Sequence, residues 1–514
     1  MKTIFLQAVW LGKATVLTTG FAVTVALVMG FATMALAAVP GDPFRVGKAN
    51  AINRLSTLVG STTGFMLRID NNGSGPALDL RVGPSTTLPA NKPVPPMKVD
   101  SQARVVNLNS DELDGKDSTD FAKSYRRTVV VSPVSGDPTA SGKALRSALQ
   151  GITGAGSSNG YLLEIEPGKY NLGSADTPLV MKPFVDIQGS GEGVTLLTAG
   201  GSADPATATV VGADNAELRY LTVNNTGNAA YARAIFSNNA SPRITHVTAV
   251  AQNGSNQTIA IGNDNGAATL TEVTADASGG NTSTAVSNDG GTPTLTGVTA
   301  TAKSASTANY GIRVSGNAKV TADRSNATAS GGTFSHGVYV QDDSSDLTLR
   351  QVIATAEGAS GYNRGVISSS GGAMTLDRVT AVASGEAGTL NLGIALGGGP
   401  GRKKLIDVEA DASGGTSAVG LQFTETSVEI RGSNIGAGAS SNSLGVVSLA
   451  NSGSHTVEID QSQITGDTGA LSVDSEFDFR IGASKLAGRV LGFGTSTCAG
   501  SYNGNYVSLT SNCA

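Results

Sequence analysis

The phrase Leu270-Thr-Glu-Val-Thr-Ala-Asp-Ala returns as Leu295-Thr-Gly-Val-Thr-Ala-Thr-Ala and as Leu376-Asp-Arg-Val-Thr-Ala-Val-Ala. Its fourth residue marks an internal repeat with a period of about 26 residues. The marker positions are Leu221, Val247, Val273, Val298, Ser325, Val352, Val379, Val408, Asn434, Gln463 and Lys485. A repeat of this length predicts a chain of similar structural units stacked on one another.

A second phrase in each copy predicts that these units are built from strands. Gly311-Ile-Arg-Val, Gly337-Val-Tyr-Val and Gly393-Ile-Ala-Leu alternate apolar and other residues with period two, which is typical of strands. Clusters of Gly, Asn, Ser and Asp separate the phrases and favour turns. No sustained 3.6-residue period and no leucine-rich repeat pattern is found. The repeat therefore predicts a β-solenoid.

A single coil cannot fold alone, because ordering 26 residues costs roughly 1 to 2 kcal/mol per residue. We expect Leu270, Val273, Ala275 and Val286 to point inward. Stacking the coils at about 4.8 Å would pair their backbones and join these residues into one apolar column. About ten or more coils would then form a rod on the order of 50 Å long.

Composition and charge limit the classes of function. The 514 residues carry a formal net charge of -5, with 15% charged residues and only 5% aromatics. This balance indicates no polyanion-binding basic patch, so we expect no nucleic-acid partner. No phosphate-binding loop, nucleotide fingerprint, Ser-His-Asp set or zinc spacing is present.

The N-terminus predicts an export signal over residues 1–37. Lys2 and Lys13 precede an apolar run over 14–32. The small-residue triplet Ala35-Leu36-Ala37 follows, as at signal cleavage sites. The alternative is an uncleaved membrane anchor. Cleavage would leave a secreted or cell-surface protein with no membrane span.

Residues 38–125 predict a separate small β-rich stalk or linker. Alternating runs at 65–70 and 77–82 flank Asn71-Asn-Gly-Ser-Gly-Pro, and prolines recur over 89–96. Leu113-Asp-Gly resembles a motif of phage tail fibres and some bacterial surface proteins. The region is poor in core residues, and the resemblance to fibre proteins, which are often trimers, implies a homotrimer formed through it. The acidic residues near Asp111 lack EF-hand spacing, although calcium remains an alternative.

The solenoid is expected over 126–491. Thr128-Val-Val-Val-Ser predicts the first strand, and residues 141–152 predict a short capping helix with Leu145 and Leu149 on one face. Tyr161 to Tyr170 and Ile187-Gln-Gly-Ser-Gly then follow. This opening resembles the pectin-lyase-like right-handed parallel β-helix superfamily, and pectinesterases in particular. The resemblance implies an all-β, right-handed parallel β-helix.

The catalytic motifs that the resemblance implies are missing. Gln341-Asp342 and Asp478-Phe479 are faint echoes of the pectinesterase signatures, but about five coils separate them. At 4.8 Å per coil that distance exceeds about 20 Å, too far for one reacting atom. Without tryptophan after residue 37, no aromatic substrate platform is expected. His336 is interpreted as a loop residue rather than part of a hydrolase motif, and we expect no metal site.

The best acidic and basic cluster falls within one coil and its turn. It contains Asp342, Asp343, Asp346 and Arg350, which are the catalytic candidates if the protein is an enzyme; the alternative is a solvated turn. The resemblance implies that pectate lyases bind calcium through acidic residues of this kind, but the primary expectation is no cofactor.

The polar residues immediately before the markers, such as Tyr220, His246 and Glu272, are interpreted as a solvated face rather than a glycan-binding groove. Cys498 and Cys513 are the only cysteines. In an exported chain we expect them to form a disulfide within a C-terminal cap over 492–514, with two free thiols as the alternative.

Taken together, these observations favour an exported, non-catalytic β-helix protein over an enzyme. It would serve as a structural, adhesive or glycan-contacting rod, with extracellular polysaccharide or surface proteins as partners. The alternative is a polysaccharide-active enzyme, a pectin or uronate lyase, esterase or glycosidase, with an unrecognised site. Two carboxylates stacked on successive coils beside an arginine would favour the enzyme.

Overall fold

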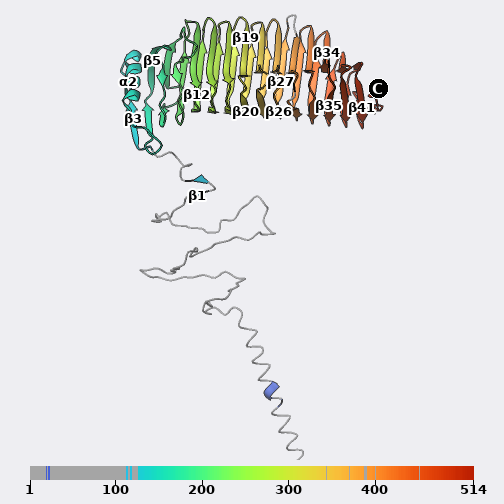
Figure 1. Cartoon of the computed structure of the whole chain (residues 1–514), viewed down its shortest axis with the longest axis horizontal. Helices are drawn as coiled ribbons and strands as arrows, with labels where there is room; N and C mark the ends of the chain where they lie inside the picture. Colours follow the sequence, from blue (N-terminus) through green and yellow to red (C-terminus); the bar gives the residue numbers. More distant parts are fainter. Residues whose placement is uncertain are drawn as a thin grey trace, which may run out of the picture. The chain divides into compact units, whose positions relative to one another are not determined.

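The computed structural model describes most of the chain from residue 125 onwards (Figure 1). The described residues are Thr19, Phe21–Val23, Glu112–Leu113, Lys116–Asp117 and 125–514 without 343, 370, 387–389, 400 and 451. The chain divides into two units, Met1–Ser110 and Asp111–Ala514. Nearly all of the predicted signal and stalk lies outside the described residues. The short strands β1 (Glu112–Leu113) and β2 (Lys116–Asp117) pair antiparallel.

From Arg127 the chain winds as a parallel β-solenoid, whose coils stack side by side in Figure 1. Ladder 1 consists of β3 (Arg127–Val131), β4 (Tyr161–Ile165), β7 (Val185–Gln188), β10 (Glu217–Asn225), β12 (Arg243–Gln252), β14 (Thr269–Thr271), β17 (Thr294–Thr296), β20 (Lys319–Asp323), β23 (Asp346–Arg350), β26 (Met374–Asp377), β29 (Lys403–Ile406), β32 (Val428–Arg431), β35 (His455–Asp460), β38 (Phe477–Gly482) and β41 (Thr495–Ala499). Every pairing within this ladder is parallel.

Two further ladders complete each coil. Ladder 2 consists of the C-terminal halves of β10 and β12 together with β5 (Gly168–Ser174), β8 (Thr195–Gly200), β15 (Thr274–Ser278), β18 (Thr299–Lys303), β21 (Asn326–Ser330), β24 (Ile353–Glu357), β27 (Thr380–Gly385), β30 (Glu409–Gly414), β33 (Asn434–Gly438), β36 (Gln463–Gly466), β39 (Lys485–Ala487) and β42 (Tyr502–Asn503). Ladder 3 consists of β6 (Leu179–Val180), β9 (Val210–Val211), β11 (Tyr231–Asn238), β13 (Gln257–Asp264), β16 (Thr282–Asp289), β19 (Ala308–Ser315), β22 (Phe334–Val340), β25 (Tyr362–Ser368), β28 (Leu390–Leu396), β31 (Ser417–Thr424), β34 (Asn442–Leu449), β37 (Gly469–Val473) and β40 (Val490–Gly492). The predicted all-β parallel β-helix is confirmed.

The core runs along the solenoid as columns of identical positions. Leu270 pairs with Leu295, and Ala275 pairs with Ala300, because one repeat later in sequence is one coil further in space. Leu270, Ala275 and the other two residues predicted to point inward, Val273 and Val286, are buried. Burying one such Leu or Val side chain contributes roughly 1.5 to 3 kcal/mol, so stability accumulates coil by coil.

The polar residues before the markers form a corner rather than a face. Tyr220, His246 and Glu272 have φ angles of 55°, 49° and 51°, the left-handed conformation that turns ladder 1 into ladder 2. In the last coils the turning residue comes one position earlier. There the serine after it, such as Ser484, is buried and accepts a hydrogen bond from the amide of Ser462.

Each end of the solenoid is covered. Helix α2 (Pro138–Gly151) lies at the N-terminal end (Figure 1), with Leu145 and Leu149 buried. It begins earlier than predicted because the Asp137 carboxylate accepts hydrogen bonds from the amides of Thr139 and Ala140, at 3.0 and 2.9 Å. Such N-caps start helices.

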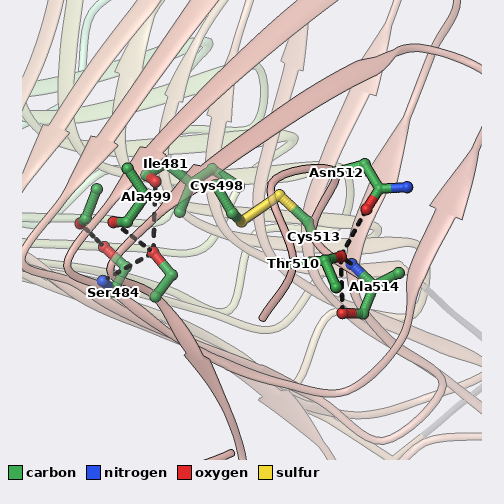
Figure 2. The surroundings of a disulfide bond; sticks show 10 residues. Ile481, Ser484, Cys498, Ala499, Thr510, Asn512, Cys513 and Ala514 are labelled. Atoms are coloured by element: carbon green, nitrogen blue, oxygen red, sulfur yellow. Dashed lines mark hydrogen bonds between the residues drawn. A yellow bond between two sulfur atoms is a disulfide. The ribbon is translucent and has the colours of Figure 1, made fainter. Parts of the chain in front are cut away.

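At the other end, the predicted disulfide joins Cys498 of β41 to Cys513 (Figure 2). The tail runs along the last coil, where the amide of Cys498 donates to the carbonyl of Ser511 at 2.8 Å and the amide of Leu509 donates to Ser501 at 2.9 Å. These bonds satisfy backbone groups that an open strand edge would leave unpaired.

Candidate functional site

The structure does not gather the four acidic and basic candidates at one point. Asp342 follows β22, and its carboxylate accepts a hydrogen bond from the Ser345 hydroxyl at 2.7 Å. Burial would raise the pKa of Asp342, but bonds from Ser345 and the Ser344 amide hold that pKa below its usual range. Asp343 lies outside the described residues.

Asp346 and Arg350 stand at opposite ends of β23. Asp346 pairs with Lys319 at 3.5 Å and accepts a hydrogen bond from the Ala373 amide at 2.8 Å. Four residues at roughly 3.3 Å each place the Cα atoms of Asp346 and Arg350 about 13 Å apart. A single reacting atom cannot contact both side chains at that separation.

Ladder 3 carries a different arrangement, which begins with a skipped residue in its strands. Arg233 pairs with Ile259, and pairing resumes at Ile235 with Ile261. The skipped residues are Ala234, Ala260, Ala285, Gly311, Gly337, Gly365, Gly393, Gly420 and Gly445. A Cβ on Gly337 would lie 2.6 Å from the carbonyl oxygen of Gly365, so this coil favours glycine, whereas three earlier coils carry alanine at the same position. Both paired strands skip the residue at the same point, so the register is kept, while the alternation of inward and outward side chains shifts by one position.

This shift creates two neighbouring rows of side chains on the outer face of ladder 3. Row 1 precedes the skipped residue and contains Arg233, Ile259, Thr284, Tyr310, His336, Arg364, Leu392, Val419 and Leu444. Row 2 follows two residues after it and contains Phe236, Gly262, Ser287, Arg313, Tyr339, Ile367, Ala395, Gln422 and Val447.

Row 1 is recessed between its neighbours. Leu392 and Val419 are only 1% and 3% exposed, although they belong to a cluster with Ile367, Ala395 and Val447 that is separate from the main core. Buried side chains outside the core show that the two rows pack against each other.

Aromatic rings occupy the middle of this face, over β19, β22 and β25. The ring centroids of Tyr310 and Tyr339 are 5.3 Å apart, and those of Tyr310 and His336 are 5.5 Å apart. Phe334 and Tyr362 stack beside them at 5.7 Å. Tyr, Phe and His therefore assemble an aromatic cluster without tryptophan, which sequence reasoning based on tryptophan did not predict.

His336 lies within strand β22 and is 4% exposed. Its interpretation as a loop residue is therefore wrong. Burial, followed by the positive charge of Arg364, lowers the pKa of His336 to about 3, so the imidazole is neutral at physiological pH. Its Nδ1 atom has no hydrogen-bond partner. A buried ring nitrogen of this kind offers a vacant hydrogen-bonding position.

Three arginines lie on the same outer face: Arg233 of β11, Arg313 of β19 and Arg364 of β25. The Arg233 guanidinium lies 4.8 Å from the Phe236 ring centroid, and that of Arg364 lies 4.5 Å from the Tyr362 centroid. Burial lowers the pKa of both. Arg313 donates from Nε to the Gln341 side-chain oxygen at 2.9 Å. Within the described residues, none of the three belongs to an ion pair.

A pair of carboxylates lies at the ends of β13 and β16, two other strands of ladder 3. Asp264 pairs in register with Asp289 of the next coil. Burial raises the pKa of Asp264; Arg233 and Arg313 partly offset this, and Asp289 adds to it. Two carboxylates on successive coils beside arginines are the feature that favours an enzyme, and no sequence motif indicated them.

The part of the chain that the structure describes contains no group of three or more His, Cys, Asp or Glu residues that could hold a metal ion. None of its helices is both long enough and apolar enough to span a membrane.

Comparisons with known proteins bear on the fold alone. No protein-family model and no curated protein matches the chain. Among solved structures, the A-module of mannuronan C-5 epimerase AlgE6 from Azotobacter vinelandii is 13% identical over 72% of this chain and 96% of that chain, with a TM-score of 0.38. The Dettilon tailspike protein is 12% identical over 71% and 68%, with a TM-score of 0.43. Pectate lyase Pel9A is 13% identical over 69% and 79%, with a TM-score of 0.32. The chain's own parallel ladders show a parallel β-helix, the fold that the sequence predicted.

Proposed function

We propose that the protein binds an extracellular glycan through the outer face of ladder 3, and that it acts as a glycan-contacting rod rather than as an enzyme. The observation that carries this proposal is the continuous stack of Tyr310, His336 and Tyr339, with Phe334 and Tyr362 beside it. Aromatic rings present a flat apolar surface, and tyrosine adds a polar edge, which together suit a sugar ring with one apolar face and hydroxyls around it.

The predicted export signal supports an extracellular location for this activity. The Cys498–Cys513 disulfide fits the same location, since disulfides persist in oxidising compartments. A rigid solenoid also holds its binding residues on strands, so little conformational freedom is lost when an extended ligand binds.

A binding assay with one matched control tests the proposal. The full chain would be screened by affinity electrophoresis and calorimetry against pectic, uronate and cell-wall polysaccharides. Tyr339→Ala should weaken binding at least about tenfold, because central aromatic anchors dominate binding energy. Tyr220→Ala removes another partly exposed tyrosine, at the corner between ladders 1 and 2, and should change nothing. Equal loss in both variants, or binding unaffected by Tyr339→Ala, would contradict the proposal.

Asp264 and Asp289 favour a second candidate function, a polysaccharide-active enzyme. Asp264 interacts electrostatically with Asp289, Arg233 and Arg313. A carboxyl with a raised pKa can act as an acid while a neighbouring carboxylate acts as a base. Release of reducing ends, unsaturated products and methanol would be followed with each polysaccharide. Turnover abolished by Asp264→Asn would establish the enzyme; turnover lost only in Asp342→Asn would direct attention to the turn after β22.

A further inference from the structure

The charge on the outer face of ladder 3 differs from the charge elsewhere on the solenoid. Seven arginines on or beside ladder 1 pair with carboxylates at 3.4 Å or less: Arg219, Arg243, Arg324, Arg378, Arg402, Arg431 and Arg480. The three arginines of ladder 3 are held over aromatic rings or by an amide side chain instead. A guanidinium that loses water without gaining a carboxylate is costly unless a ligand supplies the negative charge.

Arg364 is the clearest case. Its pKa is lowered by burial, and the only partners that act in the opposite direction are the phenols of Tyr362 and Tyr339. The Nε atom of Arg364 has no hydrogen-bond partner, and the buried Nδ1 atom of His336 has none either. The two residues are partners in the register between β22 and β25. One cationic donor and one neutral ring nitrogen therefore lie in adjacent coils with unused hydrogen-bonding capacity.

The arginines are also spaced along the axis. Arg233 lies on β11, Arg313 on β19 and Arg364 on β25. The first two are three coil steps apart, and the last two are two coil steps apart. At about 4.8 Å per coil, the separations are about 14 and 10 Å, and the set spans about 24 Å. A small anion cannot reach all three, whereas an extended polymer lying along the rod can.

The two carboxylates do not cancel this charge along the whole face. Asp264 interacts electrostatically with Arg233 and Arg313, but neither it nor Asp289 acts on Arg364. The face is therefore mixed in charge over β13 and β16 and purely cationic over β25.

From these observations we infer that the ligand of this face is an anionic glycan. It lies parallel to the solenoid axis, its acidic groups meet Arg233, Arg313 and Arg364, and its sugar rings rest on the aromatic residues between them. The inference rests on the proposed function and adds the ligand's charge, its direction and its minimum length. Carboxylate and sulfate ester groups share the chemistry that a guanidinium recognises.

The test compares four polymers on the full chain: polygalacturonate, dextran sulfate, neutral dextran and a single-stranded DNA of similar length. Polygalacturonate or dextran sulfate should bind more tightly than neutral dextran, and binding should weaken steeply between about 50 and about 500 mM NaCl because exposed charges are screened. Oligomers shorter than about 24 Å should bind more weakly than longer ones.

Three variants carry the residue assignment. Arg364→Gln should weaken binding of the acidic polymer roughly tenfold, while Arg364→Lys should restore part of it, since lysine keeps the charge but not the fork. Arg378→Gln, which removes an ion-paired arginine beside ladder 1, should have no effect. The thermal midpoint of Arg364→Gln should not fall, because an unpaired desolvated charge is removed; a fall would mark Arg364 as structural and overturn its assignment.

The remaining outcomes separate the two proposals. Equal binding of neutral and acidic glycans, unchanged in Arg364→Gln, would overturn the inference and leave the glycan-binding function in place. If no glycan bound, both would fail. If DNA bound as tightly as the acidic glycans and lost affinity in the same variant, the commitment to a glycan would be wrong.

Discussion

Ladders 1 and 3 wind through the same coils with the same repeat, yet their outer faces differ in shape and charge. Ladder 1 pairs without a skipped residue through β14, β17 and β20, and its charged side chains form ion pairs. Ladder 3 skips one residue in the coils from β11 to β34, so its outer side chains converge and are partly buried, with arginines outside any ion pair among them. Backbone irregularity, and not composition, turns one face of the solenoid into a candidate site.

A hollow of about 410 Å³ on ladder 1 sharpens the contrast. It lies over the last coils and is lined by Arg431, Glu458, Asp460 and Arg480 among others. Its guanidiniums and carboxylates occur in similar number, and Arg431 and Arg480 are already paired with Glu429 and Asp478. This hollow therefore offers space for a ligand, but its two arginines already have carboxylate partners.

The largest expected effect comes from replacing a skipped glycine. Gly337→Val would place side-chain atoms against the backbone of Gly365 and Thr355, and should lower the free energy of unfolding by about 3 kcal/mol or more. Thermal and urea unfolding measure this change. Thr348→Val, on the outer face of β23 where no residue is skipped, should stay within about 0.5 kcal/mol. Equal stability of the two variants would show that the skipped position does not require a small residue.

A pH effect should follow from His336. The folded protein holds the pKa of His336 near 3, whereas an unfolded histidine titrates near 6.5. Below about pH 6.5 the unfolded chain binds the proton first, so this residue should destabilise the fold by up to roughly 1.4 kcal/mol per pH unit until about pH 3.

His336→Tyr, which copies Tyr310 of the same row, removes this term. The difference in unfolding free energy between parent and variant should shift in favour of the variant as the pH falls from 7 to 4. Parallel curves over that range would contradict the buried, neutral histidine.

A smaller effect is expected when ladder 1 is made to resemble ladder 3. Glu429 pairs with Arg402 at 2.6 Å, with Arg431 at 3.0 Å and with Lys404 at 3.5 Å. Glu429→Gln should cost about 1 to 2 kcal/mol of stability and leave three cations unpaired. Weak, salt-sensitive binding of acidic glycans should then appear on ladder 1, measurable in a Tyr339→Ala background. No gain in binding would show that unpaired charge without aromatic rings is insufficient.

The smallest effect should come from an exposed ion pair on ladder 1. Arg378 bonds to the carboxylate of its neighbour Asp377 at 3.2 Å, and the arginine side chain is exposed. Exposed pairs of this kind contribute little, so Arg378→Gln should leave the thermal midpoint unchanged. A marked fall would mean that the charged face of ladder 1 supports the fold more than its geometry implies.

The fold was predictable because each coil repeats the same inward positions. Leu270, Val273 and Ala275 recur at fixed spacing, and that spacing can be read directly from the sequence. The corner between ladders 1 and 2 was only partly predictable. The sequence places Tyr220 and His246 in one column, but it gives no sign that the column is a corner rather than a solvated face. Their left-handed backbone conformation is a property of the turn and leaves little mark on residue type, except that glycine replaces them at Gly297.

The site was largely hidden in the sequence. Arg313 belongs to the phrase Gly311-Ile-Arg-Val, which correctly predicts a strand, and Tyr310 directly precedes that phrase. The skipped Gly311 between the two residues reverses the alternation. Strict period two would place Tyr310 and Arg313 on opposite faces, whereas the skipped residue puts both outside. The arginines are more than 100 residues apart from first to last, so the composition of the chain gave no sign of a local positive charge.

The repeat that builds the solenoid also separates the residues that the fold requires from the residues that can be exchanged. The inward residues must stay, and the skipped position must keep a small residue, because every coil depends on its neighbours for pairing and packing. The register between coils does not depend on the side chains of rows 1 and 2. In neighbouring coils the same row 1 position holds Thr284, Tyr310, His336 or Arg364, and the register is unchanged. A lineage of such proteins can therefore exchange one ligand for another by single substitutions on one face, each tried on a scaffold that stays folded throughout.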